Sequence, residues 1–196
     1  LGRLGLSYID LYQLHDVEFA ESIDEVISGA FKACLELKEQ GKIKAIGINA
    51  YPLSVLKEGI MKGDGKFDTV LSYARNTLTD DSLFEYLQFF NESNVGVICA
   101  AIQAMGMLTN LGPPVWHPAK NELKAIAAEA SGICRANDIQ LGKLAVHHSM
   151  HLPSAGKVAT FLMGMEKMEY LNYNMSAYLD GLSPKEMQIY EMLMKE

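Results

Sequence analysis

Residues 4–19 read LGLSYIDLYQLHDVEF, and the apolar run from Tyr8 to Leu14 within this stretch predicts a β-strand. The strand ends at a histidine, His15, after which the sequence turns acidic. Two interpretations of His15 are open at this point. It is either a polar residue that closes a strand at a sheet edge, or a group placed where chemistry occurs.

The rest of the chain repeats the pattern of an apolar run followed by an amphipathic segment. Strands are expected at 8–14, 44–48, 67–72, 95–101 and 158–163. Helices are expected at 22–40, 52–61, 80–93 (capped by Thr79 or Asp80), 121–136, 141–151 and 166–178, with a final helix after Ser183. Such an alternation predicts a parallel sheet covered by helices, either doubly wound or part of a (β/α)₈ barrel. In both folds the functional groups gather at the carboxyl ends of the strands, which raises the odds that His15 is functional.

Composition narrows the functional classes. The chain has 196 residues, which fits one domain, and its net charge of −7 without a long basic run argues against a nucleic-acid partner. The three cysteines are widely spaced and odd in number, so a reducing compartment is expected, and we predict a cytoplasmic protein. No run approaches the ~20 apolar residues of a membrane span, and residues 1–5 do not resemble a signal peptide, so no membrane partner is expected.

Three other features have both a structural and a functional interpretation. His147, His148 and His151 could bind a metal, but no H-E-x-x-H glutamate lies among them, so a surface or helix-end group is favoured. Gly164 follows the last expected strand, where it either lets backbone N–H groups approach an anion or makes a plain turn. Trp116 lies in the Pro-rich loop 102–119, where it either covers a ligand or pins the loop.

Read in order, four segments resemble the aldo-keto reductases, over nearly the whole chain. These are the run from Leu4 to His15, then Lys38-x-x-Gly41-Lys42-Ile43-Lys44-x-Ile46-Gly47-Ile48, then Gly96-Val97-Ile98 with the loop Gly106-Met107-Leu108-Thr109, and Met163-Gly164-Met165 with Asn174. Within the family, residues 15–19 and 111–118 are most similar to the L-galactose dehydrogenase-like branch. The resemblance implies that this chain holds about the last five βα units of a single (β/α)₈ barrel domain.

The family's catalytic set is an Asp, a Tyr, a Lys and a His, and the resemblance makes His15 the histidine of that set. A neutral imidazole N–H at a strand end can orient a substrate oxygen and stabilise charge that develops on it. The family's Asp, Tyr and Lys precede the fourth strand, so three of the four residues are not expected here. The chain does not begin with Met, and we expect an N-terminally truncated sequence. As a fragment it is expected to be inactive and aggregation-prone, with unpaired edges on its first and last strands.

By the same resemblance, a nicotinamide cofactor would lie against a set of residues after the strands. This set consists of Asn49, Ala101, Gln103, Gly164, Met165 and Asn174, while Trp116 is assigned to the substrate. The match is uneven: where many members have Ser-Asn, Gln and Tyr around the nicotinamide, this chain has Asn49-Ala50, Val70 and Ala100. NAD or NADP is implied. NAD is favoured, because Glu166 would repel a 2′-phosphate and Lys167 is the one cation close by in sequence.

The leading hypothesis is therefore an oxidoreductase that moves a hydride between NAD(P) and a carbonyl or alcohol, with a sugar such as L-galactose as substrate. A second hypothesis is a non-catalytic member of the same fold that binds a cofactor or a protein partner. A third, an unrelated phosphate-binding α/β domain, would use Gly164 as its anion site. Substrate identity and oligomeric state stay open.

Overall fold

The computed structural model describes residues 1–151 and 157–195, and its five strands form one sheet. In sheet order, which is also chain order, the strands are β1 (Ile9–Leu14), β2 (Ile43–Ala50), β3 (Thr69–Tyr73), β4 (Gly96–Ala100) and β5 (Thr160–Leu162). Pairing is parallel from β1 to β4. The strand positions and their parallel pairing agree with the sequence-based prediction, and β1 and β5 are the two outer strands.

The helices follow the strands as expected. They are α1 (Ile23–Val26), α2 (Lys32–Glu39), α3 (Leu53–Lys62), α4 (Phe84–Glu92), α5 (Asn121–Ala136), α6 (Leu141–His151), α7 (Met168–Leu179) and α8 (Pro184–Leu193). A π-helical turn, Ile27–Phe31, joins α1 to α2, so the helix predicted at 22–40 is continuous but not α-helical throughout. Among the described residues, no helix combines the length and apolarity needed to cross a membrane.

One helix start was predicted wrongly. The sequence indicated a helix at 80–93 capped by Thr79 or Asp80, whereas α4 begins at Phe84 and its N-cap, Leu83, makes no side-chain cap. Asp80 is engaged elsewhere, because its Oδ2 accepts a hydrogen bond from Arg75 Nη1 at 2.8 Å. Thr77 and Asp80 also form a short antiparallel bridge, which closes a turn over Leu78 and Thr79.

The described residues divide into two compact units. The first holds residues 1–73, 82–100 and 157–160, and the second holds residues 74–81, 101–151 and 161–195.

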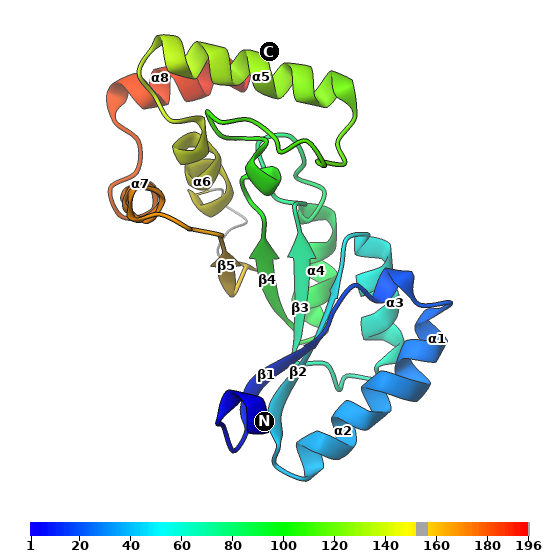
Figure 1. Ribbon diagram of the computed structural model, residues 1–196. Coiled ribbons are helices and arrows are strands. Elements are labelled where there is room, and N and C mark those ends of the chain that lie inside the picture. The colour runs from blue at the N-terminus through cyan, green and yellow to red at the C-terminus, as the bar shows by residue number, and fades with distance from the viewer. Residues whose placement is uncertain (152–156, 196) are drawn as a thin grey trace. The chain divides into compact units, whose positions relative to one another are not determined.

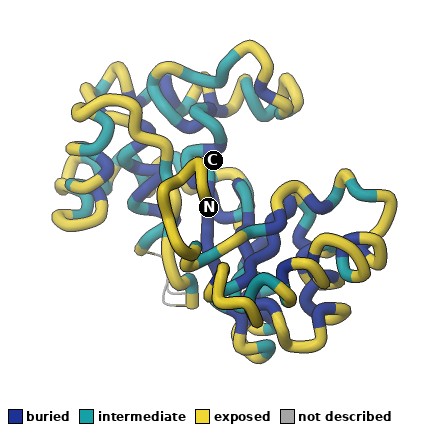
Figure 2. Tube along the Cα trace, turned by 60° about the horizontal axis from the view of Figure 1, so that its bottom comes forward, coloured by how far each residue is buried: buried dark blue, intermediate teal, exposed yellow. Residues whose placement is uncertain are grey.

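In the first unit, one face of the sheet is packed against helices (Figure 1). The fully buried Ile46, Ile48, Val70 and Val97 alternate with residues of the opposite face, as the two-residue period of a strand requires. The packing is close: a Cβ added at Gly59 of α3 would lie 2.5 Å from Ile48 Cδ1. Figure 2 shows the result, with buried segments of the chain in the interior and exposed segments on the outside.

On the other face of this sheet, the strand register aligns residues of β2, β3 and β4 that lie near the candidate site. The register aligns Asn49 of β2 with Leu71 of β3, and Leu71 with Ile98 of β4. Leu71, Ile98 and Ala100 form a small buried cluster with Leu11 and Tyr73 packed against it. Because Gln13 pairs with Gly47, the alternation along β1 directs His15 to the same face as Asn49.

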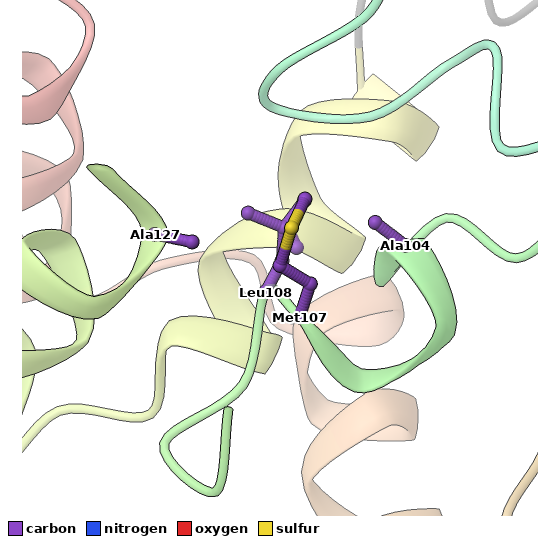
Figure 3. Close-up of a cluster of buried hydrophobic side chains, with 5 residues drawn as sticks. Ala104, Met107, Leu108 and Ala127 are labelled. Atoms are coloured by element: carbon purple, nitrogen blue, oxygen red, sulfur yellow. The ribbon is translucent and has the colours of Figure 1, made fainter. Parts of the chain in front are cut away.

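The second unit has two apolar cores. In Figure 3, Met107 and Leu108 lie between Ala104, in the loop after β4, and Ala127, in α5. Ala145 of α6 completes the cluster. The other core joins Cys134, Ile139, Leu141 and Leu144 to the inner side of α8. Burying a side chain of this size contributes roughly 1.5–3 kcal/mol, so these contacts fix the loop after β4 and the helices that follow it.

Candidate active site

His15 follows the last residue of β1 at its carboxyl end, as predicted, and its side chain is 75% exposed. Its one short polar contact among the described residues is with Asp16, whose Oδ1 lies 3.1 Å from His15 Nδ1. Asp16 has a left-handed backbone (φ 54°), which ends the extended conformation at this point. The imidazole therefore projects from a strand end and is largely exposed.

Asn49 fixes the backbone beneath His15. Its Oδ1 accepts a hydrogen bond from the Asp16 N–H at 3.2 Å, and its Nδ2 donates to Leu71 O at 3.5 Å. The residue is buried at the carboxyl half of β2. Asn49 thus ties the turn after β1 to two neighbouring strands, a role that the sequence did not reveal because all three segments are distant along the chain.

Aromatic and acidic groups surround this strand-end region. Glu18 Oε1 accepts a hydrogen bond from the Tyr51 N–H at 2.8 Å, and the rings of Tyr51 and Tyr73 lie 6.1 Å apart. Burial raises the pKa of the Tyr73 phenol, and the nearby Tyr51 and Asp16 raise it further. Tyr73 is consequently a neutral hydrogen-bonding group at neutral pH.

The chain immediately after β4 has an unusual backbone. Ala101, Ala104 and Met105 all have positive φ, between 46° and 55°, and Gly106 follows with φ 89°. Left-handed conformations cost an L-residue roughly 1–2 kcal/mol each. They persist here because Ala104 and the following Met107 are locked in the core shown in Figure 3.

This turn brings Gln103 to Asn174, 71 residues later. Gln103 Nε2 donates to Gly142 O at 3.2 Å and to Asn174 Oδ1 at 3.1 Å. Burial raises the pKa of the adjacent Tyr173 phenol, and a hydrogen bond with the Gln103 side chain opposes that rise. Asn174 is 1% exposed, and its Nδ2 has no hydrogen-bond partner within residues 1–151 and 157–195. A buried donor of this kind is what a bound polar ligand would satisfy.

The other predicted cofactor residues lie in exposed chain. Gly164 and Met165 are between β5 and α7, and no side chain of the described residues comes within 4 Å of a Cβ built at Gly164. Lys167 is the N-cap residue of α7, and its Nζ lies 5.4 Å from the centroid of the Tyr170 ring. The cation nearest to this segment in sequence is therefore placed over an aromatic ring.

Trp116 is 70% exposed, whereas its neighbour His117 is buried. His117 Nδ1 accepts from the Ala119 N–H at 3.1 Å, which leaves Nε2 to donate to Ala104 O at 2.9 Å. Lys124 Nζ also donates to His117 O. The loop 102–119 is thus pinned by His117, which sequence reasoning missed, and Trp116 is available for contacts with a ligand.

The three clustered histidines serve the packing of α6. His148 Nδ1 is 2.9 Å from the Tyr190 hydroxyl of α8, and the rings of His147 and His151 stack with centroids 4.4 Å apart. Within the part of the chain that the structure describes, no group of three or more His, Cys, Asp or Glu side chains is arranged to hold a metal ion.

Comparison with known proteins gives a consistent result. The model of the aldo/keto reductase family matches residues 1–195. L-galactose dehydrogenase of Arabidopsis thaliana is 35% identical over 178 residues, covering 90% of this chain and 54% of the plant protein. D-arabinose 1-dehydrogenase of Saccharomyces cerevisiae is 30% identical over 207 residues, covering 98% of this chain and 61% of the yeast protein.

A solved structure, the holo form of aldo-keto reductase AKR11C1 from Bacillus halodurans, matches with a TM-score of 0.66 and 26% identity. The match covers 98% of this chain and 63% of that protein. The five parallel strands with their helices are thus part of a (β/α)₈ barrel, as the sequence predicted. The chain spans just over half to about three fifths of the length of the curated relatives named above.

Proposed function

The chain belongs to the aldo/keto reductase family, whose model matches residues 1–195. We propose that it is part of an oxidoreductase that acts on an aldose. The relatives named as L-galactose and D-arabinose dehydrogenases support a sugar substrate. The observation that carries the proposal is this whole-chain match, together with a histidine at the carboxyl end of β1.

The residues of the second unit suit a nicotinamide cofactor. Asn174 offers a buried N–H donor without a partner in the described chain, and Gln103 contacts it. We assign these two residues, with Ala101, to the cofactor site, where Gln103 acts on the cofactor directly or through Asn174, and add Gly164 and Met165 from the exposed segment before α7. Asn49, engaged with Asp16, would act on the cofactor or through the turn that carries His15. A bound nicotinamide supplies or accepts the hydride.

His15 is the proposed catalytic residue, and Trp116 is the proposed substrate contact. Contact of Nδ1 with Asp16 favours the tautomer with its proton on Nδ1 when the carboxylate is charged, and protonation of Nε2 as well gives a cation held by that carboxylate. In the cation the Nε2–H can donate to a substrate oxygen and stabilise the charge that develops there, whereas in the neutral tautomer Nε2 is an acceptor that can orient a substrate hydroxyl. Asn49 keeps the Asp16 backbone in place, so that the ring stays at the strand end.

The test uses the 196-residue chain itself. NADH binding is measured by fluorescence titration, and oxidation of L-galactose or D-arabinose is followed at the NADH absorbance. We expect saturable binding without turnover, because the resemblance assigns only His15 of the four catalytic residues to this chain. Normal turnover would contradict the proposed inactivity. Absence of NAD(P)(H) binding would contradict the cofactor assignment. The substrate class is tested with an enzyme that also carries the other three catalytic residues. If that enzyme binds the cofactor and is active but does not oxidise sugars, the substrate class is wrong.

We also propose a preference for NAD over NADP. Glu166 adds negative charge beside the segment assigned to the cofactor, and Lys167 lies over Tyr170. A 2′-phosphate would be repelled by the carboxylate. We expect tighter binding of NADH than of NADPH in parallel titrations, and a Glu166→Lys variant should narrow the gap. A preference for NADPH by more than about tenfold, roughly 1.4 kcal/mol, would show that the charge argument is wrong.

A further inference from the structure

A short hydrogen-bond chain links the loop after β4 to α6 and α7. Gln103 Nε2 lies 3.2 Å from Gly142 O and 3.1 Å from Asn174 Oδ1. A backbone carbonyl oxygen can only accept, so the Gly142 contact fixes which end of the Gln103 amide is the NH₂ group. That end then requires an acceptor from its second neighbour.

The orientation of Asn174 follows from that of Gln103. Its amide must turn Oδ1 toward the donating Gln103, which turns Nδ2 away from it. In this position Nδ2 is buried, and no acceptor from residues 1–151 or 157–195 bonds to it. A buried donor left unpaired costs about 1–3 kcal/mol. The network therefore holds one polar group in a state that a ligand atom would relieve.

Gly142 leaves room for the end of the Gln103 side chain. A Cβ added at Gly142 would lie 2.9 Å from Gln103 Nε2 and 3.3 Å from the Tyr173 hydroxyl. Gln103 is also hydrogen-bonded to the Tyr173 side chain, on the helix turn next to Asn174. Glycine at 142 is thus the residue that allows the glutamine to reach a backbone carbonyl and a side chain together.

We propose that Gln103 is a positioning residue, which orients the Asn174 amide so that Nδ2 donates to a hydrogen-bond acceptor on the bound cofactor. The inference rests on the proposed function for the identity of the ligand. Gln103 acts through Asn174, and Gly142 provides the space in which it does so.

A double-mutant cycle tests this coupling in the whole chain. Gln103→Met keeps the length of the side chain and removes its donors, and Asn174→Ala removes the oriented amide. We expect each single change to weaken NADH binding about tenfold. The double variant should bind no more weakly than Asn174→Ala alone, because Gln103 has then lost the group it orients. Additive losses would show that Gln103 contacts the cofactor independently, which would overturn the proposal.

Two further variants separate orientation from folding. Gly142→Ala retains every hydrogen-bonding group but crowds Gln103 Nε2, so it should reproduce the tenfold loss. Gln188→Met makes the same chemical change at an exposed position of α8 and should leave binding unaltered. Unchanged binding in Gly142→Ala would contradict the role assigned to this glycine, and a loss in the control would contradict the assignment of the effect to Gln103.

A measurement without ligand distinguishes failure of this inference from failure of the proposed function. In the NMR spectrum of the unliganded chain, the side-chain NH₂ pair of Asn174 should be well resolved. It should shift or broaden in Gln103→Met but not in Gln188→Met. If the Asn174 NH₂ resonances neither shift nor broaden in Gln103→Met, the positioning role is overturned, whether or not the chain binds NADH. A coupled signal without any NADH binding instead overturns the cofactor assignment alone.

Discussion

The position of His15 depends on residues other than His15 itself. Its ring is largely exposed and touches Asp16, and the position of that turn depends on a hydrogen bond from the Asp16 N–H to Asn49. Gln103 and Asn174 show the same dependence in the second unit. At the scale of single residues, the turn after His15 and the Asn174 amide are each held by a polar partner that is distant in sequence.

The histidines of α6 predict a pH dependence of stability. Burial lowers the pKa of His148, with Asp81 opposing the effect, and burial together with the neighbouring His151, His148 and Lys143 lowers the pKa of His147, with Glu186 opposing. The ordinary pKa of histidine is 6.5. A histidine whose pKa is lower in the folded state binds protons more readily when unfolded, so protonation favours unfolding.

We therefore expect the free energy of unfolding to be highest above about pH 6.5 and to fall as the pH drops from there toward the lowered pKa values. Urea denaturation at pH 7.5 and 5.5 measures this difference. A His147→Gln/His148→Gln double variant should show a smaller difference, and His15→Gln, at an exposed position, should not. An equal pH response in all three proteins would contradict the assignment.

At the scale of elements, the ends of helices decide how well each one is fixed. α8 begins with a full capping box, in which Ser183 Oγ accepts from the Glu186 N–H at 3.3 Å and Glu186 Oε2 accepts from the Ser183 N–H at 2.7 Å. Glu186 also pairs with Lys143 of α6 at 2.9 Å, with both side chains largely buried. The cap thus contributes both to the start of α8 and to its attachment to α6.

Replacing Ser183 by Ala should destabilise the protein by about 1 kcal/mol, the usual cost of losing an N-cap side chain. The change should appear as a lower urea midpoint and as faster amide exchange in the first turn of α8. Ser54→Ala, at an exposed position of α3, is the matched control and should leave both measurements unchanged. Equal effects of the two substitutions would show that the cap is not responsible.

Helix and strand positions were largely predictable, because they depend on local patterns. The limits of α5 and α6 agree with the expected ranges 121–136 and 141–151, and the Ser183 cap was expected. The start of α4 was missed because Arg75 and Thr77 engage Asp80 in a local structure that competes with capping. Gly142 and His117 were missed for another reason. Their roles depend on Gln103, 39 residues away, and on the fold of a long loop.

At the scale of the whole molecule, the outer strands are the consequential feature. β1 is the first strand of the sheet order, and exposed aromatic residues lie on and beside it, namely Tyr8 and Tyr12. An outer strand presents unpaired backbone groups that can pair with another chain. Lys44 places a positive charge at this strand, which disfavours its pairing with another chain. Its Nζ lies over the Tyr8 ring and pairs with Asp10.

We expect the 196-residue chain to self-associate with rising concentration, as measured by light scattering. Tyr12→Lys should reduce the association several-fold, because a charge on an outer strand disfavours strand pairing between molecules. Tyr178→Lys makes the same change on an exposed position of α7 and should leave it unaltered. Equal solubilisation by both variants would indicate a general effect of charge rather than a role of β1.

The sheet order has a consequence for how the chain is made. Each strand pairs with the strand that precedes it in the chain, from β1 to β5. A ribosome therefore delivers every new strand after its partner has already been synthesised, and no strand has to wait for a distant partner to emerge. Assembly of these five strands can proceed in one direction during translation, from β1 toward β5. Across these five strands, the spatial order of the sheet is then the same as the order of synthesis.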